Sequence, residues 1–348
     1  MKKNYFHIIF LLFCGASGAQ VNNKITLKSA SNIKIGAAVS IKVLKNDSLC
    51  LPLLKKEFNS ITAENAMKMH QLTDEKGNYQ WQEADYLVKL AKDNHWRIHG
   101  HTLVWHEAIP KWIDKENIDS TKLENIMKKH IQTVISRYKS SVKSWDVVNE
   151  IFVNNSDSLR NSLWKTTLGD EFACRAFKYA REAGGNYIKL FYNDFNNERI
   201  DKKLEASLKY FENCKKIGVT IDGIGFQMHV GLDEADSSSI ARNVLKAADK
   251  GYLIHFSELD ISNDKQESRK VYTDSFALAL SNKYKMIASV YSKIPENQQF
   301  GITFWNVHDG KTWLKSYFKH KYEWPLLFDE KFQRKAAYYG FVKGLKQK

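Results

Sequence analysis

Two glutamates at the ends of apolar stretches are the residues of this chain best suited to acid–base chemistry. One stretch runs from Ser144 to Glu150 (SWDVVNE), and a Trp with two adjacent Val is typical of a buried strand. A second stretch, from Ile254 to Asp260, carries Glu258. Two carboxyl groups at two strand ends could cleave a glycosidic bond, because one can protonate the leaving oxygen while the other attacks the sugar or activates water.

Strands that hold these glutamates must be connected, and short apolar runs alternate with longer helical patterns in eight rounds. We expect strands at 33–39, 60–63, 97–104, 144–148, 189–192, 223–227, 254–258 and 300–304. We expect helices near 48–58, 82–94, 121–138, 170–183, 198–217, 237–250, 267–293 and 334–346. Eight βα units close into a barrel more readily than they form an open sheet, so the sequence predicts an α/β fold, a (β/α)8 TIM barrel in a single domain.

Polar and aromatic residues follow seven of these strands, at the ends where barrel enzymes hold their catalytic groups. In strand order they are Glu64 and Asn65, His101 and Trp105, Asn149 and Glu150, Asn193 and Asp194, Gln227 and His229, Glu258, and Trp305. Any one of them could be an ordinary polar residue between a strand and a loop. Together they favour one shared site at this end of the barrel.

Nine segments across nearly the whole chain after residue 20 carry a resemblance to a known family. They are GAAV (36–39), FNSITAENAMK (58–68), GHTLVWH (100–106), WDVVNE (145–150), LFYNDFN (190–196), DGIGFQMH (222–229), SELDI (257–261), GITFW (301–305) and PLLFD (325–329). In these the chain resembles the family 10 glycoside hydrolases, the endo-1,4-β-xylanase family. The Asn-Glu pair with a later Glu is shared by a wider clan of retaining β-glycosidases, and the second- and third-strand segments narrow the resemblance to this family.

The resemblance implies a role for each glutamate. Glu150 would be the general acid/base and Glu258 the nucleophile of a retaining double displacement on internal β-1,4-xylosidic bonds of xylan, with no cofactor and no metal. The acid needs a pKa raised by burial or a nearby carboxylate, and the nucleophile needs donors that keep it ionised. His229 matches the family's strand-six histidine and could keep Glu258 charged. We therefore expect the two carboxyl groups to lie about 5 to 5.5 Å apart.

The resemblance also implies residues that bind the sugar chain. Those expected to contact xylan and xylo-oligosaccharides are Glu64, Asn65, Lys68, His101, Trp105, Asn149, Gln227, His229, Trp305 and Trp313. Asn149 would contact the 2-hydroxyl of the sugar before the scissile bond, a contact that strengthens toward the transition state. Lys68 lies four residues after Glu64, so on a helical turn the two would share a face.

Three places depart from the family pattern. Phe195 stands where the family usually has tyrosine, which removes a hydroxyl on the leaving-group side, Asn306 replaces a common glycine after Trp305, and the segment from His308 to Lys311 differs from the usual loop. These changes leave the glutamate pair unchanged. They bear on subsite affinity and product length.

Other functions remain open from the residues alone. His99 and His101 face the same way if they lie on one strand, and with His106 they could bind a metal ion, but no obvious set of further ligands completes the shell. A related barrel enzyme that cuts another β-glucan is a second alternative. A glycan-binding surface protein with a dead site is a third, and the presence of both glutamates argues against it.

The chain of 348 residues carries a formal charge of +14, which allows nucleic-acid binding. Its lysines are scattered along polar helix faces, as at Lys128 and Lys129, so we expect solvated helix surface and no nucleic-acid partner. Adsorption to an acidic polysaccharide is a further hypothesis from the same charge. We expect a monomer.

The first nineteen residues have the pattern of an export signal. Lys2 and Lys3 precede a short apolar run, and Ala19 suits cleavage before Gln20. We therefore expect residues 20–348 to form the catalytic barrel of an exported protein, whether secreted, periplasmic or at the cell surface. A lipid anchor at Cys14 is the alternative.

Three cysteines remain after such cleavage, so they cannot all pair with one another. Cys174 and Cys214 fall on successive predicted helices and could form a disulfide, which would leave Cys50 as a thiol.

Overall fold

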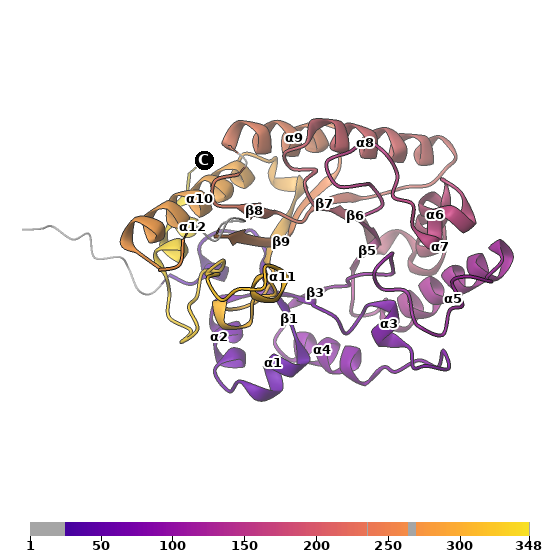
Figure 1. Ribbon diagram of the computed structural model, residues 1–348, viewed down its shortest axis with the longest axis horizontal. Coiled ribbons are helices and arrows are strands. Elements are labelled where there is room, and N and C mark those ends of the chain that lie inside the picture. The colour runs from indigo at the N-terminus through magenta and orange to yellow at the C-terminus, as the bar shows by residue number, and fades with distance from the viewer. Residues whose placement is uncertain (1–24, 235, 264–268, 348) are drawn as a thin grey trace, which may run out of the picture.

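Parallel strands alternate with helices in the computed structural model, which describes residues 25–234, 236–263 and 269–347 (Figure 1). The strands are β1 (Ile35–Val39), β2 (Ser60–Ala63), β3 (Arg97–His99), β4 (Val104–Trp105), β5 (Ser144–Asn149), β6 (Lys189–Asp194), β7 (Gly223–Phe226), β8 (His229–Gly231), β9 (Leu253–Ser262) and β10 (Gln299–Phe304). The helices are α1 (Ile41–Asn46), α2 (Cys50–Glu57), α3 (Met69–Leu72), α4 (Gln82–Asp93), α5 (Ser120–Tyr138), α6 (Leu163–Leu168), α7 (Phe172–Gly184), α8 (Asp201–Lys216), α9 (Ser237–Asp249), α10 (Asp274–Ser292), α11 (Leu314–Tyr317) and α12 (Ala336–Leu345).

The sheet closes on itself through the segment that contains β3 and β4. Hydrogen-bonded neighbours follow the order β3-β2-β1-β10-β9-β7-β6-β5-β4, so the two ends of the path belong to one stretch of chain. Between them the amide of Gly100 donates to the carbonyl of Ser144 at 2.9 Å. A Cβ on Gly100 would lie 2.1 Å from the Trp145 ring, so only glycine allows this approach. The predicted barrel is confirmed, with helices around its outside (Figure 1).

Most predicted elements differ from the structure by a few residues at their ends, and three differ more. The expected strand 97–104 is two strands, because the chain leaves the ladder after His99 to make the Gly100 contact. The expected strand 254–258 extends to Ser262, because β8 pairs with its outer half. The helix expected from Glu267 begins at Asp274, where the hydroxyl of Thr273 accepts the amide hydrogen of Phe276 as an N-cap.

Rings fill the barrel interior near the N-terminal ends of the strands. The centroids of Phe191 and Phe300 lie 4.5 Å apart, and those of His99 and His255 lie 4.9 Å apart. The guanidinium of Arg97 lies 3.9 Å from the centroid of the Phe300 ring. This packing makes the lower barrel a solid core, so chemistry is confined to the opposite mouth.

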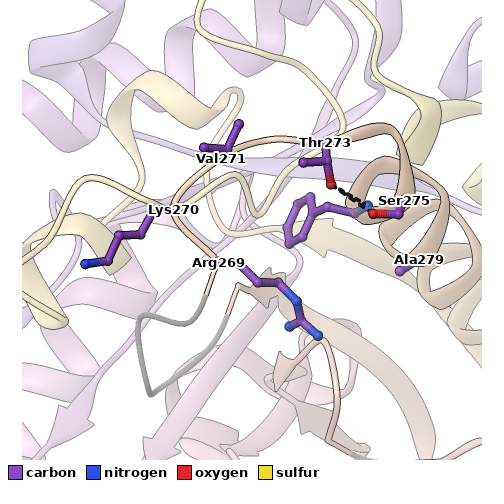
Figure 2. Close-up of a pocket in the computed structure, with 7 residues that line it drawn as sticks. Arg269, Lys270, Val271, Thr273, Ser275 and Ala279 are labelled. Carbon is purple, nitrogen blue, oxygen red and sulfur yellow. Dashed lines mark hydrogen bonds between the residues drawn. The ribbon is translucent and has the colours of Figure 1, made fainter.

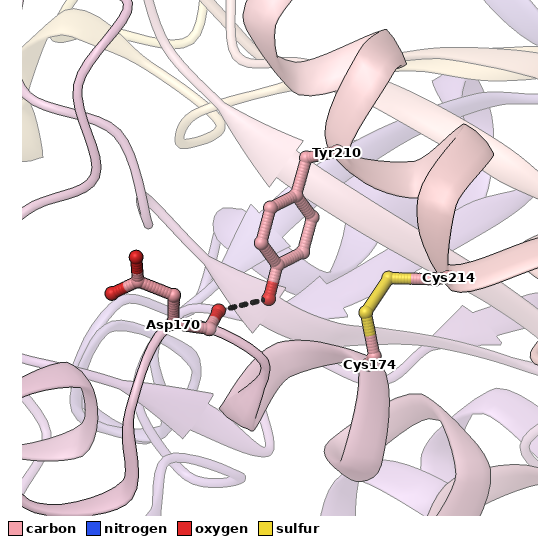
Figure 3. Close-up of a disulfide and its surroundings, with 4 residues drawn as sticks. All are labelled: Asp170, Cys174, Tyr210 and Cys214. Carbon is pink, nitrogen blue, oxygen red and sulfur yellow. Dashed lines mark hydrogen bonds between the residues drawn. A yellow bond between two sulfur atoms is a disulfide. The ribbon is translucent and has the colours of Figure 1, made fainter. Parts of the chain in front are cut away.

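A disulfide joins α7 to α8 on the outside of the barrel (Figure 3). It links Cys174 and Cys214, as the sequence allowed, with Cα atoms 5.3 Å apart. Beside it the hydroxyl of Tyr210 donates to the carbonyl of Asp170 at 2.6 Å (Figure 3). Cys50 is a buried thiol.

The expected export signal at residues 1–19 and Cys14 lie outside the described residues. Within the described ranges, the helices are all too short or too polar to cross a membrane.

Candidate active site

A network of side-chain amides joins the two glutamates at the C-terminal mouth of the barrel. The Asn193 amide, on β6, donates to Asn149 Oδ1 at 2.9 Å and to Glu258 Oε1 at 2.6 Å. The Gln227 amide donates to Asn149 Oδ1 at 3.3 Å and to Glu150 Oε1 at 3.0 Å. The predicted strand ends of β5, β6, β7 and β9 therefore meet around one pair of carboxyl groups.

Glu150 follows β5 directly and has a positive φ of 57°. Its amide donates to the carbonyl of Asn193 at 2.9 Å, which extends the β5–β6 pairing by one residue. Burial raises the pKa of Glu150 to about 7, and the charge of Asp194 adds to this increase. A carboxyl group with this pKa can hold a proton near neutral pH and release it to a leaving oxygen.

Glu258 lies in β9 beside a charged histidine. Nε2 of His229 is 3.3 Å from Glu258 Oε2, and its Nδ1 is 2.8 Å from Asp260 Oδ1. Burial alone would lower the pKa of His229, but these two carboxylates raise it to about 10. Burial likewise favours neutral Glu258, yet the hydrogen bond from His229 and the charge of His101 outweigh it and lower the pKa of Glu258. An ionised Glu258 can act as a nucleophile.

Asp146 lies on β5, and its carboxylate contacts His99 and His101, two of the histidines considered as metal ligands. Its Oδ1 is 3.0 Å from His99 Nε2, and its Oδ2 is 2.9 Å from His101 Nδ1. Despite burial, which would raise it, the imidazoles hold the pKa of Asp146 well below its usual range. Among residues 25–234, 236–263 and 269–347, no group of three or more His, Cys, Asp or Glu is arranged to hold a metal ion.

Lys68 reaches across the mouth from the loop after β2. Its ammonium donates to Asn65 Oδ1 at 3.0 Å and lies 4.8 Å from the centroid of the Trp105 ring. Residues 64–67 form bends and a turn rather than a helix, so the expected helical face shared by Glu64 and Lys68 is wrong. Burial raises the pKa of Glu64. The arrangement offers donors, an acceptor and a ring face to a sugar.

Two tryptophans from the segment after β10 enclose the His229 ring. The centroid of Trp313 lies 5.1 Å from that of His229, and the centroid of Trp305 lies 6.2 Å from it. Nε1 of Trp313 donates to Asp260 Oδ2 at 2.8 Å, so this indole is fixed to the same carboxylate that orients the histidine. Their faces could carry a sugar chain past Glu258.

Two of the departures from the family pattern, Asn306 and Phe195, lie at this rim. Asn306 has a φ of 127°, a conformation that glycine adopts more readily, and its amide donates to the carbonyl of Lys311 at 2.9 Å. The buried ammonium of Lys203 lies 4.3 Å from the centroid of the Phe195 ring.

Three residues of the site, Asp146, Asp260 and Arg160, were not predicted from the sequence. Asn193 and Asp194 were expected at this mouth as strand-end residues, but without a role. Asp260 could have been found, because it lies two residues after Glu258 on one strand and therefore faces the same way. Arg160 gave no signal, since its contact with Glu150 depends on how a loop folds back.

A separate pocket lies beside the start of α10 (Figure 2). It is lined by Arg269, Lys270, Val271, Thr273, Ser275, Phe276 and Ala279. The described lining includes two cations, Arg269 and Lys270, and no carboxyl group.

Comparisons with known proteins agree with this geometry. A family model described as "Glycosyl hydrolase family 10" matches residues 23–344. Endo-1,4-beta-xylanase C of Paenibacillus barcinonensis is 36% identical over 337 residues, which cover 90% of this chain and 31% of that protein. Endo-1,4-beta-xylanase A of Caldicellulosiruptor sp. (strain Rt8B.4) is 37% identical over 328 residues, covering 90% and 46%. The chain thus spans less than half the length of these two relatives.

A solved structure matches over almost its full length. Xylanase 10B from Thermotoga petrophila RKU-1, in complex with xylobiose, is 32% identical with a TM-score of 0.86. The match covers 93% of this chain and 98% of that one.

Proposed function

Because the chain belongs to glycosyl hydrolase family 10, we propose that it hydrolyses internal β-1,4-xylosidic bonds of xylan with retention of configuration. The observation that carries this proposal is the pair of glutamates in one amide network, Glu258 buried and Glu150 half-buried, whose neighbours move the two pKa values in opposite directions. The names of the relatives and the xylobiose complex of a structural neighbour support xylan as the substrate class.

In the first step Glu258 attacks the anomeric carbon while Glu150 gives its proton to the leaving oxygen. The bond from the anomeric carbon to that oxygen breaks, a bond to Glu258 forms, and the leaving chain departs as an alcohol. The acid is prepared for this role by burial and by Asp194, which raise its pKa to about 7, so that a large fraction of Glu150 carries a proton near neutral pH.

In the second step Glu150 acts as a base. The charge of Glu258 is one of the influences that raise the pKa of Glu150, and it disappears when Glu258 becomes an ester. Glu150, now a stronger acid, is ionised and takes a proton from water as that water attacks the anomeric carbon. Two inversions at one carbon give net retention.

Asn149 can assist at the sugar's 2-hydroxyl. Its carbonyl oxygen accepts from Asn193 and Gln227, and its amide donates to Glu150 Oε1 at 3.1 Å. An amide nitrogen carries two hydrogens, so one remains for a substrate oxygen. The surrounding bonds fix the orientation of this donor before substrate arrives.

Product analysis on xylan, with the anomer of the first-formed products followed by NMR, tests this function. We expect release of oligosaccharides whose new reducing ends are initially β, and no release by Glu258→Ala. Initial α products would overturn retention. Faster cleavage of soluble cellulose than of xylan would overturn the substrate and favour the other β-glucan enzyme.

We further propose that the protein is exported. The disulfide between Cys174 and Cys214 supports this, because such bonds persist in oxidising compartments. Sequencing the N-terminus of protein recovered outside the cytoplasm should find Gln20 first, whereas a lipid-modified Cys14 would favour the anchored alternative.

A further inference from the structure

One arginine, Arg160, holds the main chain of Glu150, the residue that follows β5. Glu150 has a φ of 57°, in the left-handed region that a glutamate seldom occupies. Nε of Arg160 donates to the carbonyl oxygen of Glu150 at 3.1 Å. Its Nη2 donates to the carbonyl of Phe152 at 3.0 Å and to Asn154 Oδ1 at 2.8 Å. A single guanidinium therefore binds two carbonyls of the turn that follows the glutamate.

The main chain adds to this closure. The amide of Arg160 donates to the carbonyl of Ile151 at 2.7 Å, and Phe152 and Leu159 form an antiparallel bridge. On the other side of Glu150, its own amide is bonded to the carbonyl of Asn193. Both peptide groups that flank the Glu150 Cα are thus held, one by β6 and one by Arg160.

We propose that Arg160 is a positioning residue for Glu150, keeping the left-handed turn that aims the carboxyl group at the amide network and the scissile oxygen. The inference rests on the proposed acid/base role of Glu150. Strain of this kind persists only where surrounding contacts impose it, and the carbonyl bond is such a contact. Loss of the bond would let the Glu150 peptide rotate and its carboxyl group swing from the reacting oxygen.

The arginine fork suits this task better than a lysine would. Its planar guanidinium presents donors in fixed directions and can serve three oxygens of one turn, whereas an ammonium is a point charge on a flexible stem. Nε and Nη2 of Arg160 donate to two main-chain carbonyls and to the side-chain amide oxygen of Asn154. Arg160 therefore acts on where Glu150 points rather than as its counter-ion.

The test is the dependence of rate on the leaving group. Aryl β-xylobiosides of phenol need a proton at the leaving oxygen, while those of 2,4-dinitrophenol do not. For Arg160→Met we expect kcat/KM on the phenyl substrate to fall by about 10² and on the dinitrophenyl substrate by less than about 3-fold, because general acid catalysis contributes roughly 10²–10⁴. Arg160→Lys should show the same pattern, and it keeps the charge if the methionine variant folds poorly.

Azide gives a second readout. A misplaced Glu150 also serves poorly as base, so the glycosyl enzyme accumulates with the dinitrophenyl substrate. Added azide, an anion that attacks without a base, should raise turnover of the Arg160 variants several-fold and form β-xylobiosyl azide. It should not raise turnover of the wild-type protein.

Arg181→Met is the matched control. Arg181 also donates to two carbonyls, those of Gly185 and Ile188, and to one side chain, Asp222. It does so where β6 and β7 begin, at the opposite end of the barrel. This variant should change the two aryl substrates by the same factor and should not respond to azide.

An equal loss on both aryl substrates in the Arg160 variants, without azide response, would overturn the inference. Glu150→Ala in the same assay separates this from failure of the proposed function. If Glu150→Ala itself shows no leaving-group dependence, its acid/base role is wrong; if it does and the Arg160 variants do not, only the positioning role is wrong.

Discussion

The surroundings of Glu150 and Glu258 differ in composition although both residues lie at one barrel mouth. Around Glu150 the donors are neutral amides and the Trp105 indole, and the charge that raises its pKa most is that of Asp194. Around Glu258 the principal partner is an imidazolium, His229, which is held by Asp260. Burial pushes both pKa values upward, so depth does not distinguish them. The neighbours on adjacent strands decide which carboxyl group is acid and which is anion.

The largest effect should come from removing the anionic member of the pair. Glu258→Ala should lower kcat on xylan by on the order of 10⁵-fold, because no other group can take over the covalent step. Hydrolysis is measured as reducing ends released. Glu330→Ala, which removes an exposed carboxyl group paired with Lys315, should leave activity unchanged. Comparable losses in the two variants would mean that Glu258 has no special role.

Removing the carboxylate that keeps His229 charged beside Glu258 should have the next largest effect. Asp260→Asn removes the main source of the raised His229 pKa, so less imidazolium remains to keep Glu258 ionised. The Glu258 pKa should then rise, and the acid limb of kcat/KM should move to higher pH, with a loss of roughly 10- to 100-fold at pH 6. Asp222→Asn, at the opposite end of the barrel, should leave the limb in place.

The pKa of Glu150 can be shifted in the opposite direction, downward. Glu150 must be protonated to act, so kcat/KM of the wild-type protein should fall as pH rises through about 7. Asp194→Asn removes a charge that raises this pKa, so the basic limb should move to lower pH. Asp309→Asn is the matched control, because Asp309 is a buried carboxylate bonded to Lys335, as Asp194 is to Lys203. A basic limb that stays at its wild-type pH in Asp194→Asn would contradict the electrostatic account.

Removing the distant disulfide should leave the surroundings of both glutamates unchanged. Cys174→Ser opens a bridge across 40 residues of sequence, and loop-closure entropy suggests a loss of about 4 kcal/mol of unfolding free energy. The melting temperature should fall, while both limbs of the pH profile stay in place at 25 °C. Dithiothreitol should lower the melting temperature of the wild-type protein and not of the variant.

The place of both glutamates could be predicted from the sequence, because strand ends are local patterns, whereas their different roles came only from the family resemblance. Glu150, Asn149 and Glu258 each follow an apolar run, and in a parallel barrel all such ends meet at one mouth. The Gly100 contact that closes the sheet could not be predicted, since it depends on the size of the Trp145 ring on another strand. Nor could the late start of α10, where the Thr273 cap decides the first turn.

Asn193 links the two half-reactions through a single nitrogen atom. Its Nδ2 donates both to Glu258 and to the oxygen of Asn149, whose own amide reaches Glu150. A rotation of this one side chain would disturb acid and nucleophile together. Selection for a new working pH would therefore have to act through Asp194 or Asp260, on the flanks of the network, while its centre stays unchanged.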